Sequence, residues 1–248
     1  MRHPSVEETV ELTSVVSDPE TQSTHERGPT WARTQITHGD SGMRHSFVIL
    51  LLISCVTLPL SAQSPQGWKM RVDRSQNAQD PDDRPDLAFK TLGKAFHVKG
   101  GPAGTFWNAS NNAAGNYTLK ATFSLNEPSS HPNFYGLVFG GSQLEAAGQA
   151  YTYFVVAQDG SFLIRQRNGN DVKDVARAPH ASVKRPDGSG KSSNTLEVRV
   201  AGNTVSYVVN GTVVHSLARN AVTTDGIVGF RVNHQLDVAV EGFELQRS

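Results

Sequence analysis

The stretch that decides the fold is YTYFVVAQDGSFLIRQR, residues 151–167. Two runs rich in aromatic and β-branched residues flank the pair Asp159-Gly160. An Asp-Gly pair between apolar runs is the strongest short-range signal for a β-hairpin, because a type I′ turn needs φ > 0 at both central positions. We therefore predict a hairpin with a two-residue turn, in which Val155 faces Ile164 and Phe154 faces Arg165.

This predicted register divides the hairpin into two faces, since side chains alternate along a strand. The face suited to a core carries Tyr153, Val155, Ala157, Phe162 and Ile164. The mixed face carries Thr152, Phe154, Val156, Leu163, Arg165 and Arg167. An arginine beside an aromatic ring can form a cation–π pair or present planar donors to a sugar or a carboxylate. The alternative is that the two arginines only keep an outer sheet face soluble.

Strand-like segments recur about every ten residues along the rest of the chain, which is typical of all-β proteins. No window of the chain keeps a helical period. Gly202-Asn203 and Asn210-Gly211 predict two tight turns, and Gly242 predicts a bulge that turns Phe243 inward. The predicted strands are residues 91–98, 105–107, 117–125, 135–139, 151–157, 162–166, 195–201, 204–209, 212–217, 227–232 and 236–245.

The meander around those two tight turns predicts a sheet that is buried on one side, as in a β-sandwich. The expected inward residues are Leu196, Val198, Val200, Val205, Tyr207, Val209 and Val214. The expected outward residues are Glu197, Arg199, Ser206 and His215. The sequence thus indicates an antiparallel two-sheet sandwich over residues 87–248.

The N-terminal part divides into three segments. Residues 1–42 are polar and are interpreted as a disordered extension or a mis-assigned translation start. Residues 43–62 read as a signal peptide, because a short basic segment precedes an apolar run, and that run is shorter than the ~20 residues of a membrane span. Residues 63–86 are expected to be flexible. We expect export to the periplasm or medium and no membrane span in the mature chain, with a lipoprotein attached at Cys55 as the alternative.

Composition narrows the possible functions. The formal net charge is zero, which gives no electrostatic case for a nucleic-acid partner. The single cysteine, Cys55, lies in the leader, so the mature chain has no disulfide or thiol chemistry. The acidic run DPDDRPD, residues 80–86, could hold calcium or form a solvated turn, and it does not match an EF-hand. The histidines have no paired spacing, so we expect no metal site and no cofactor.

Three segments, residues 151–167, 194–214 and 225–243, resemble the concanavalin A-like lectin/glucanase superfamily. The last of them is similar to laminin-G-like and bacterial keto-disaccharide-hydrolase-like domains. The resemblance implies a jelly-roll sandwich. The paired-carboxylate motif of laminarinase-type hydrolases is absent from this sequence, which argues against that catalysis.

Within this resemblance, the expected function is non-catalytic binding of a glycan or cell-surface polysaccharide. The sugar would lie on the concave sheet, with Tyr135 or Phe154 as an aromatic platform. Arg165, Arg167 and His234 would supply hydrogen bonds. The alternatives are a glycosidase of the keto-disaccharide type and a structural envelope protein without a small ligand.

Overall fold

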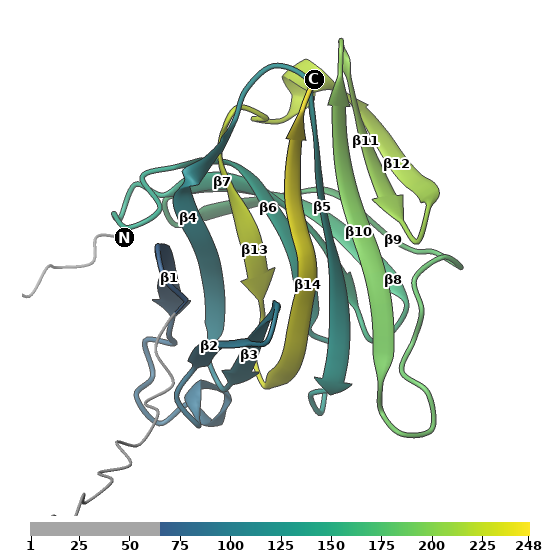
Figure 1. The fold of residues 1–248 in the computed structure, drawn as a ribbon. Helices are drawn as coiled ribbons and strands as arrows, with labels where there is room; N and C mark the ends of the chain where they lie inside the picture. The colour runs from purple at the N-terminus through teal and green to yellow at the C-terminus, as the bar shows by residue number, and fades with distance from the viewer. Residues whose placement is uncertain (1–64) are drawn as a thin grey trace, which may run out of the picture. The chain divides into compact units, whose positions relative to one another are not determined.

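The computed structural model describes residues 65–248, which form two antiparallel sheets of seven strands packed face to face (Figure 1). Sheet A runs in the order β1 (Trp68–Asp73), β4 (Ala103–Ala113), β13 (Gly226–Val232), β6 (Phe134–Ser142), β7 (Ala150–Ala157), β8 (Ser161–Asn168) and β9 (Asp171–Pro179). Sheet B runs β12 (Thr212–Ala218), β11 (Thr204–Val209), β10 (Ser192–Ala201), β5 (Tyr117–Glu127), β14 (Leu236–Arg247), β3 (Ala95–Gly100) and β2 (Ala88–Leu92). The expected all-β jelly-roll sandwich is confirmed.

Only two short 3₁₀ turns interrupt the strands of residues 65–248, η1 (Pro81–Asp83) and η2 (Arg219–Ala221). Within the same range, no helix is long and apolar enough to cross a membrane. The predicted leader, its Cys55 and the N-terminal extension lie outside the described residues. Strand β1 pairs with β4 at the edge of sheet A, so the sandwich begins upstream of the expected boundary at residue 87.

The main core lies between the two sheets. It contains fully buried aromatic side chains from both layers, among them Phe106, Phe123, Tyr135, Phe154, Tyr207 and Phe230. Burying each such side chain contributes roughly 1.5–3 kcal/mol. Strand β5 shows how the sequence produces a one-sided sheet, because its apolar residues are buried and its intervening polar residues are partly or fully exposed.

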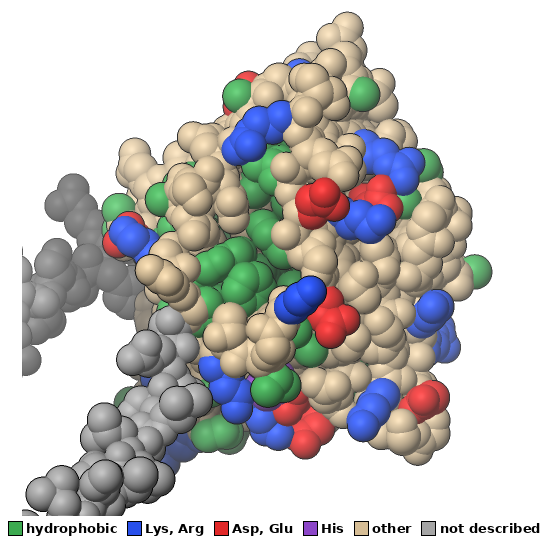
Figure 2. All heavy atoms as spheres, viewed as in Figure 1, with side chains coloured by type: hydrophobic (Ala, Val, Ile, Leu, Met, Phe, Trp, Pro, Cys, Tyr) green, Lys and Arg blue, Asp and Glu red, His purple; other side chains and the backbone are tan. Residues whose placement is uncertain are grey.

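The last strand contains the predicted bulge. The register of β14 against β5 shifts between Glu241 and Glu244, and Phe243 turns toward Phe230, with ring centroids 6.1 Å apart. The pairing of β14 with β3 stops at Val240, so the remainder of β14 is paired with β5 alone. Figure 2 shows hydrophobic side chains in a hollow beside this part of sheet B.

The meander of β10, β11 and β12 follows its two predicted turns. Ala201 pairs with Thr204 and Val209 pairs with Thr212, so each loop has two residues. The predicted inward residues are buried, except for Val214, which is half-buried. The expectation for His215 is wrong. A register shift after Tyr207 turns the His215 ring inward, to 6.1 Å from Phe162.

The central hairpin, β7–β8, departs from its predicted register by one residue. Val155 pairs with Leu163 and Phe154 pairs with Ile164, which leaves a three-residue loop instead of two. In this loop the Gly160 N–H bonds to the Ala157 carbonyl, and only Gly160 has a positive φ, +84°. The Asp159 carboxylate accepts the Ser161 N–H at 2.9 Å. A type I turn followed by a left-handed glycine therefore replaces the expected type I′ turn.

Two other segments also differ from expectation. The predicted strand 91–98 is a hairpin, because Gly93 at φ +62° turns the chain between β2 and β3. Strand β9 was not predicted, since it is an exposed edge strand whose sequence DVKDVARAP lacks a clear apolar alternation. Edge strands carry charged residues because a long apolar edge would promote association.

Candidate binding face

The side of sheet A that faces away from sheet B, here called the outer face of sheet A, carries a second hydrophobic cluster. Its members are Trp107, Val138, Leu144, Tyr151, Tyr153, Val155 and Leu163. Strands β6 and β7 are therefore buried on both sides, which explains why their sequences do not alternate. A cluster on the outside of a sheet has to be covered, and here the segment 143–149 contributes Leu144 to that cover.

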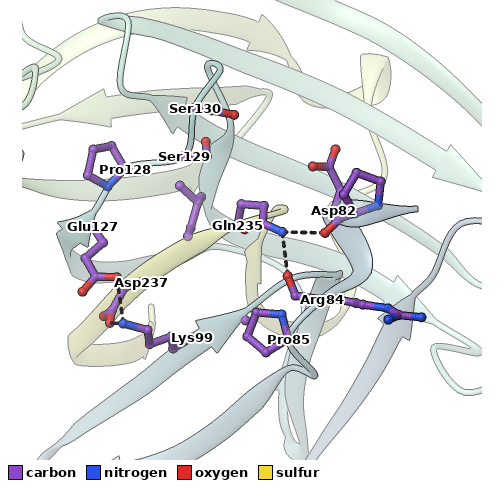
Figure 3. A pocket seen from close by; sticks show the side chains of 13 residues that line it. Asp82, Arg84, Pro85, Lys99, Glu127, Pro128, Ser129, Ser130, Gln235 and Asp237 are labelled. Atoms are coloured by element: carbon purple, nitrogen blue, oxygen red, sulfur yellow. Dashed lines mark hydrogen bonds and ion pairs between the residues drawn. The ribbon is translucent and has the colours of Figure 1, made fainter. Parts of the chain in front are cut away.

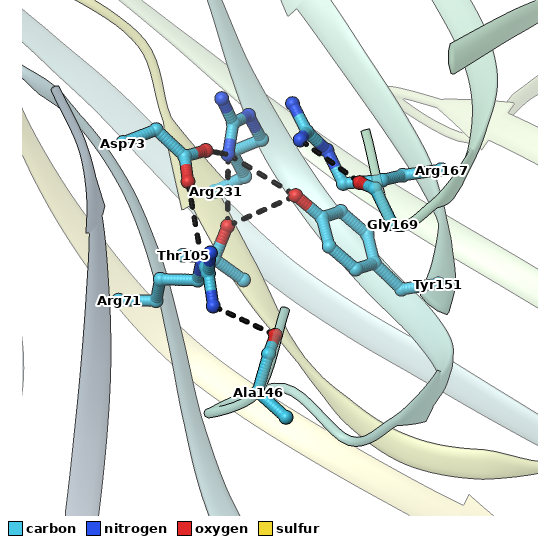
Figure 4. A network of polar contacts seen from close by, with 8 residues as sticks. All are labelled: Arg71, Asp73, Thr105, Ala146, Tyr151, Arg167, Gly169 and Arg231. Atoms are coloured by element: carbon cyan, nitrogen blue, oxygen red, sulfur yellow. Dashed lines mark hydrogen bonds and ion pairs between the residues drawn. The ribbon is translucent and has the colours of Figure 1, made fainter. Parts of the chain in front are cut away.

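Arg231 on β13 is the buried centre of a polar network on this face (Figure 4). Its Nη1 donates to Asp73 Oδ2 at 2.6 Å, to Thr105 Oγ1 at 2.9 Å and to Tyr151 Oη at 3.3 Å. The guanidinium also lies 5.7 Å from the centre of the Tyr153 ring. Burial acts to lower the pKa of Arg231, but the neighbouring Tyr151 and Asp73 hold that pKa above its ordinary value. The guanidinium is therefore a permanent charge held in one orientation.

Strand β1 anchors the covering segment. Arg71 Nη1 donates to the Ala146 carbonyl at 2.9 Å, and Lys69 Nζ pairs with Glu145 at 2.6 Å. With its amide oriented to accept, Gln149 also takes a hydrogen bond from Arg71 Nε at 3.0 Å. These contacts join β1 to the loop between β6 and β7, so the cover has a defined position over the cluster.

The edge of the same face, on β8 and β9, carries three partly exposed arginines. Arg165 sits opposite Tyr153 and pairs with Asp174, whose hydrogen bond raises the pKa of Arg165. Arg167 sits opposite Tyr151; its Nη1 reaches the Gly169 carbonyl at 3.4 Å, and its buried Nε has no partner. Arg177 sits opposite Leu163. We call Arg165, Arg167 and Arg177 the arginine edge.

An aromatic ring also lies beneath Arg177. Its guanidinium carbon is 5.3 Å from the centre of the Phe134 ring, a cation–π arrangement. Phe134 packs against the second hydrophobic cluster. The arginine edge therefore presents planar donors from a rigid apolar surface.

The structure brings together only part of the predicted site. Arg165 and Arg167 share one face, as predicted, but the aromatic residues opposite them are Tyr153 and Tyr151 and not Phe154. Phe154 and Tyr135 are fully buried in the main core, so the prediction that either ring forms an exposed platform is wrong. A one-residue slip in register exchanges the two faces of a strand, and it places Tyr151 and Tyr153 where Phe154 was expected.

His234 lies apart from the arginines, in the loop after β13. Sequence reasoning missed Arg231, Arg177 and the two tyrosines. Tyr151 and Tyr153 are two residues apart on a strand, so their shared face was readable from the sequence. The one-residue difference in turn length concealed which face it was.

A second polar region lies on the outer face of sheet B and at the adjoining loops (Figure 3). Asp237 accepts from Asn126 Nδ2 at 3.0 Å, contacts His97 Nε2 at 2.7 Å and pairs with Lys99 at 3.0 Å. Lys99 also pairs with Glu127 at 2.7 Å. Lys99, Glu127 and Asp237 line a cavity of about 660 Å³. Burial acts to raise the pKa of Asp237, but these partners bring it below its ordinary value.

Three of the four carboxylates in the acidic run at residues 80–86 make local contacts. Asp80 accepts from the Asp82 N–H, Asp83 from the Ser75 N–H, and Asp86 pairs with Arg74. Within residues 65–248, no group of three or more His, Cys, Asp or Glu side chains is arranged to hold a metal ion.

Comparison with known proteins identifies the fold. No family model matches the chain, and no curated protein matches its sequence. Among solved structures, the carbohydrate binding module CBM66 from Bacillus subtilis is similar over 73% of this chain and 96% of its own, with a TM-score of 0.54 and 10% identity. A protein of unknown function with a galectin-like fold, also from Bacillus subtilis, reaches 0.48 at 12% identity, covering 72% and 88% of the two chains.

The carbohydrate recognition domain of Emp46p in its metal-free form reaches a TM-score of 0.47 at 11% identity, with 73% of this chain and 88% of that chain covered. At these identities, a structural likeness identifies the fold and not the ligand. The first comparison agrees with the β-sandwich fold that the sequence indicated.

Proposed function

We propose that this protein is a non-catalytic glycan-binding module and that the outer face of sheet A is its binding surface. The observation that carries the proposal is the arginine edge beside the second hydrophobic cluster. Sugar recognition needs planar hydrogen-bond donors next to apolar ring surface. Arg165, Arg167 and Arg177 provide the donors, and the half-buried ring of Phe134 beneath Arg177 provides the apolar surface.

Preorganisation supports the same proposal. Arg231 and Asp73 fix the floor of the face, and Arg71 holds the covering segment. A surface whose side chains are already ordered loses less conformational entropy when a ligand binds. The fold of this chain is also shared with a protein described as a carbohydrate binding module, which is consistent with the proposed role.

The acidic side chains argue for binding over hydrolysis. A glycosidase needs one carboxyl group that stays protonated near neutral pH, so its pKa must be raised. Asp237, the most enclosed carboxylate of the cavity in Figure 3, has a lowered pKa and is occupied by Asn126, His97 and Lys99. This arrangement suits a structural carboxylate.

A glycan-array screen tests the proposal. Wild-type protein should bind at least one glycan class, and the double variant Arg165→Ala/Arg167→Ala should bind it more weakly. Arg199→Ala is the matched control. Arg199 is an exposed arginine on β10 of sheet B, where it pairs with Glu197 of the same strand. Equal affinity of the double variant and wild type would remove these arginines from the site, and absence of binding to every glycan would refute the function.

We also propose export, on the strength of the leader pattern in residues 43–62. N-terminal sequencing of protein from the producing cell should begin near Gln63. Recovery of intact Met1 in the cytosol would contradict export, and an acylated N-terminal Cys55 would establish the lipoprotein alternative.

A further inference from the structure

We propose that the ligand of the outer face of sheet A is an acidic glycan, whose carboxylate or sulfate groups bind along the arginine edge. This inference rests on the proposed glycan-binding function and specifies the ligand class. The inference rests on a difference between the basic side chains of this face: some already have partners within the chain, and others do not.

Each basic group in the interior of the face already has partners within the chain. Arg231 is 6% exposed and has four hydrogen-bond partners, including Asp73. Arg71 is engaged by the Ala146 carbonyl and by Asp73. Lys69 pairs with Glu145. None of these groups has to pair with a ligand.

The arginine edge is different. Arg165 is the one member paired with a carboxylate, Asp174, and the Asp174 side chain is 50% exposed. Among the described residues, no carboxylate lies within ion-pair distance of Arg167 or Arg177; their contacts are the Gly169 carbonyl and the Phe134 ring. Arg167 Nε is buried and unpartnered. Only one of the three guanidinium groups is thus paired with a carboxylate at ion-pair distance, while Asp159 and Asp174 act on Arg177 only through longer-range electrostatic attraction.

The spacing of these groups suits a polymer. Arg165 and Arg167 are alternate residues of β8 and so project about 6.6–6.8 Å apart on the same side. Arg177 lies on the neighbouring strand β9 opposite Leu163, two residues along β8 from Arg165, with a register shift of β9 between the two positions. A row of planar cations along a strand matches a linear chain that carries an anionic group on successive sugars, because a guanidinium binds a carboxylate or sulfate through two parallel hydrogen bonds.

The experiment compares acidic polysaccharides with neutral forms of the same backbone. The probes are polygalacturonate, alginate and a sulfated galactan, set against carboxyl-reduced polygalacturonate, carboxyl-reduced alginate and desulfated galactan. Affinity electrophoresis and calorimetry give the dissociation constants. We expect binding to at least one acidic form, at least tenfold weaker binding to its neutral counterpart, and progressive weakening as salt is raised, since exposed charges are screened.

Single variants locate the site. Arg167→Gln and Arg177→Gln should each weaken binding of the acidic form about tenfold, which corresponds to one charge-assisted hydrogen-bond pair. Arg199→Gln on sheet B should leave the affinity unchanged. Gln keeps a polar side chain of similar reach, so folding is preserved, and a melting curve of each variant verifies this.

The outcomes separate the two proposals. Equal binding of an acidic polysaccharide and its neutral counterpart, or binding of neutral glycans alone, would overturn the acidic class and leave the glycan-binding function standing. Binding of no glycan in either charge state would overturn both. Acid-selective binding that Arg167→Gln and Arg177→Gln leave intact would overturn the assignment to the arginine edge.

Discussion

The outer faces of the two sheets differ in how their side chains are shielded from water. The outer face of sheet B is covered by short cross-strand polar pairs, such as Thr122 with Thr195 and Ser124 with Ser193, at 2.8 and 3.2 Å. Figure 2, which looks toward sheet B, shows acidic and basic side chains side by side on it. The outer face of sheet A instead buries a second hydrophobic cluster and the guanidinium of Arg231.

This difference separates a solvated face from a preorganised one. On sheet B, the exposed polar side chains, such as Ser124 and Ser193, can exchange their partners for water at little cost, and only Glu197 and Asp237 are buried carboxylates. On sheet A, Arg231 and Asp73 must stay paired because their partners are out of water, and they hold the surrounding side chains in place. A sheet with a second hydrophobic cluster on its outside can therefore display charged groups from a rigid base.

The largest expected effect comes from removing the buried charge. Arg231→Met leaves Asp73 without its main partner and removes the Arg231 donor from Thr105 and Tyr151, so it should reduce the free energy of unfolding by about 3–5 kcal/mol. Arg199→Met, the same change on sheet B, should cost less, about 1 kcal/mol, because the Arg199 side chain is 45% exposed and its partner Glu197 keeps a second cation, Lys120, at 3.6 Å. Denaturant unfolding of the two variants measures both values.

Equal losses from the two substitutions would contradict the comparison, because they would place Arg231 on a solvated surface. The double variant Asp73→Asn/Arg231→Met serves as a second control. It removes both charges, so it should be more stable than Arg231→Met alone if the loss comes from the half-buried Asp73 carboxylate, which in Arg231→Met keeps only the longer contact to Arg71 at 3.5 Å.

The next effect concerns the turn that decides which side chains reach the outer face of sheet A. Gly160 has φ +84°, so Gly160→Val should cost on the order of 1–3 kcal/mol. Gly211 in the β11–β12 turn has nearly the same φ, +83°, but a Cβ there meets no atom within 4 Å, whereas at Gly160 it meets Arg185 at 2.6 Å. Gly160→Val should therefore lose at least as much as Gly211→Val. If the denaturation midpoint of Gly160→Val equals that of wild type, the turn does not lie at Gly160.

The same hairpin shows what the sequence could and could not predict. Turns, strand spacing and the alternating pattern of β5 follow from local chemistry, so the sandwich and most of sheet B were predictable. The register of β7–β8 was not, because the Asp159 side chain accepts the Ser161 N–H and favours a longer loop than the Asp-Gly pair suggests. Strand β7 gives no compensating signal, since it is apolar on both faces.

Only the part of the site that lies on β8 was predictable from the sequence. Arg165 and Arg167 share a face whatever the turn length, because they are two residues apart on one strand. Their aromatic neighbours depend on the register, so Phe154 was chosen and Tyr153 was missed. Arg231, Thr105 and Asp73 come from distant parts of the chain, and only the order of strands in sheet A brings them together.

A smaller effect appears at acid pH and distinguishes the carboxylates of the two faces. The folded-state pKa of Asp237 is lowered, so its contribution to stability is present above the unfolded pKa of about 3.9 and is lost as pH falls through the folded value. Asp237→Asn should therefore be less stable than wild type at neutral pH, and the difference in free energy of unfolding between the two proteins should shrink as pH falls below about 4. Asp174, whose pKa is also lowered, is 50% exposed, so Asp174→Asn should show a weaker dependence. Unfolding curves at several pH values test this, and parallel curves for Asp237→Asn and wild type would contradict it.

The smallest expected effect is the stability cost of losing Arg165 and Arg167 together. Arg165 contributes one partly exposed ion pair and Arg167 one long hydrogen bond, so the double Ala variant should lose no more than about 1 kcal/mol. The opposing possibility is that the arginine stems seal Tyr153, which is only 5% exposed, in which case packing would be lost as well as charge. A loss above about 2 kcal/mol in denaturant unfolding would place the arginines in the cover of the second hydrophobic cluster. A small loss leaves the two guanidinium groups free to act on a ligand, so any fall in glycan affinity in the same variant then reports binding and not folding.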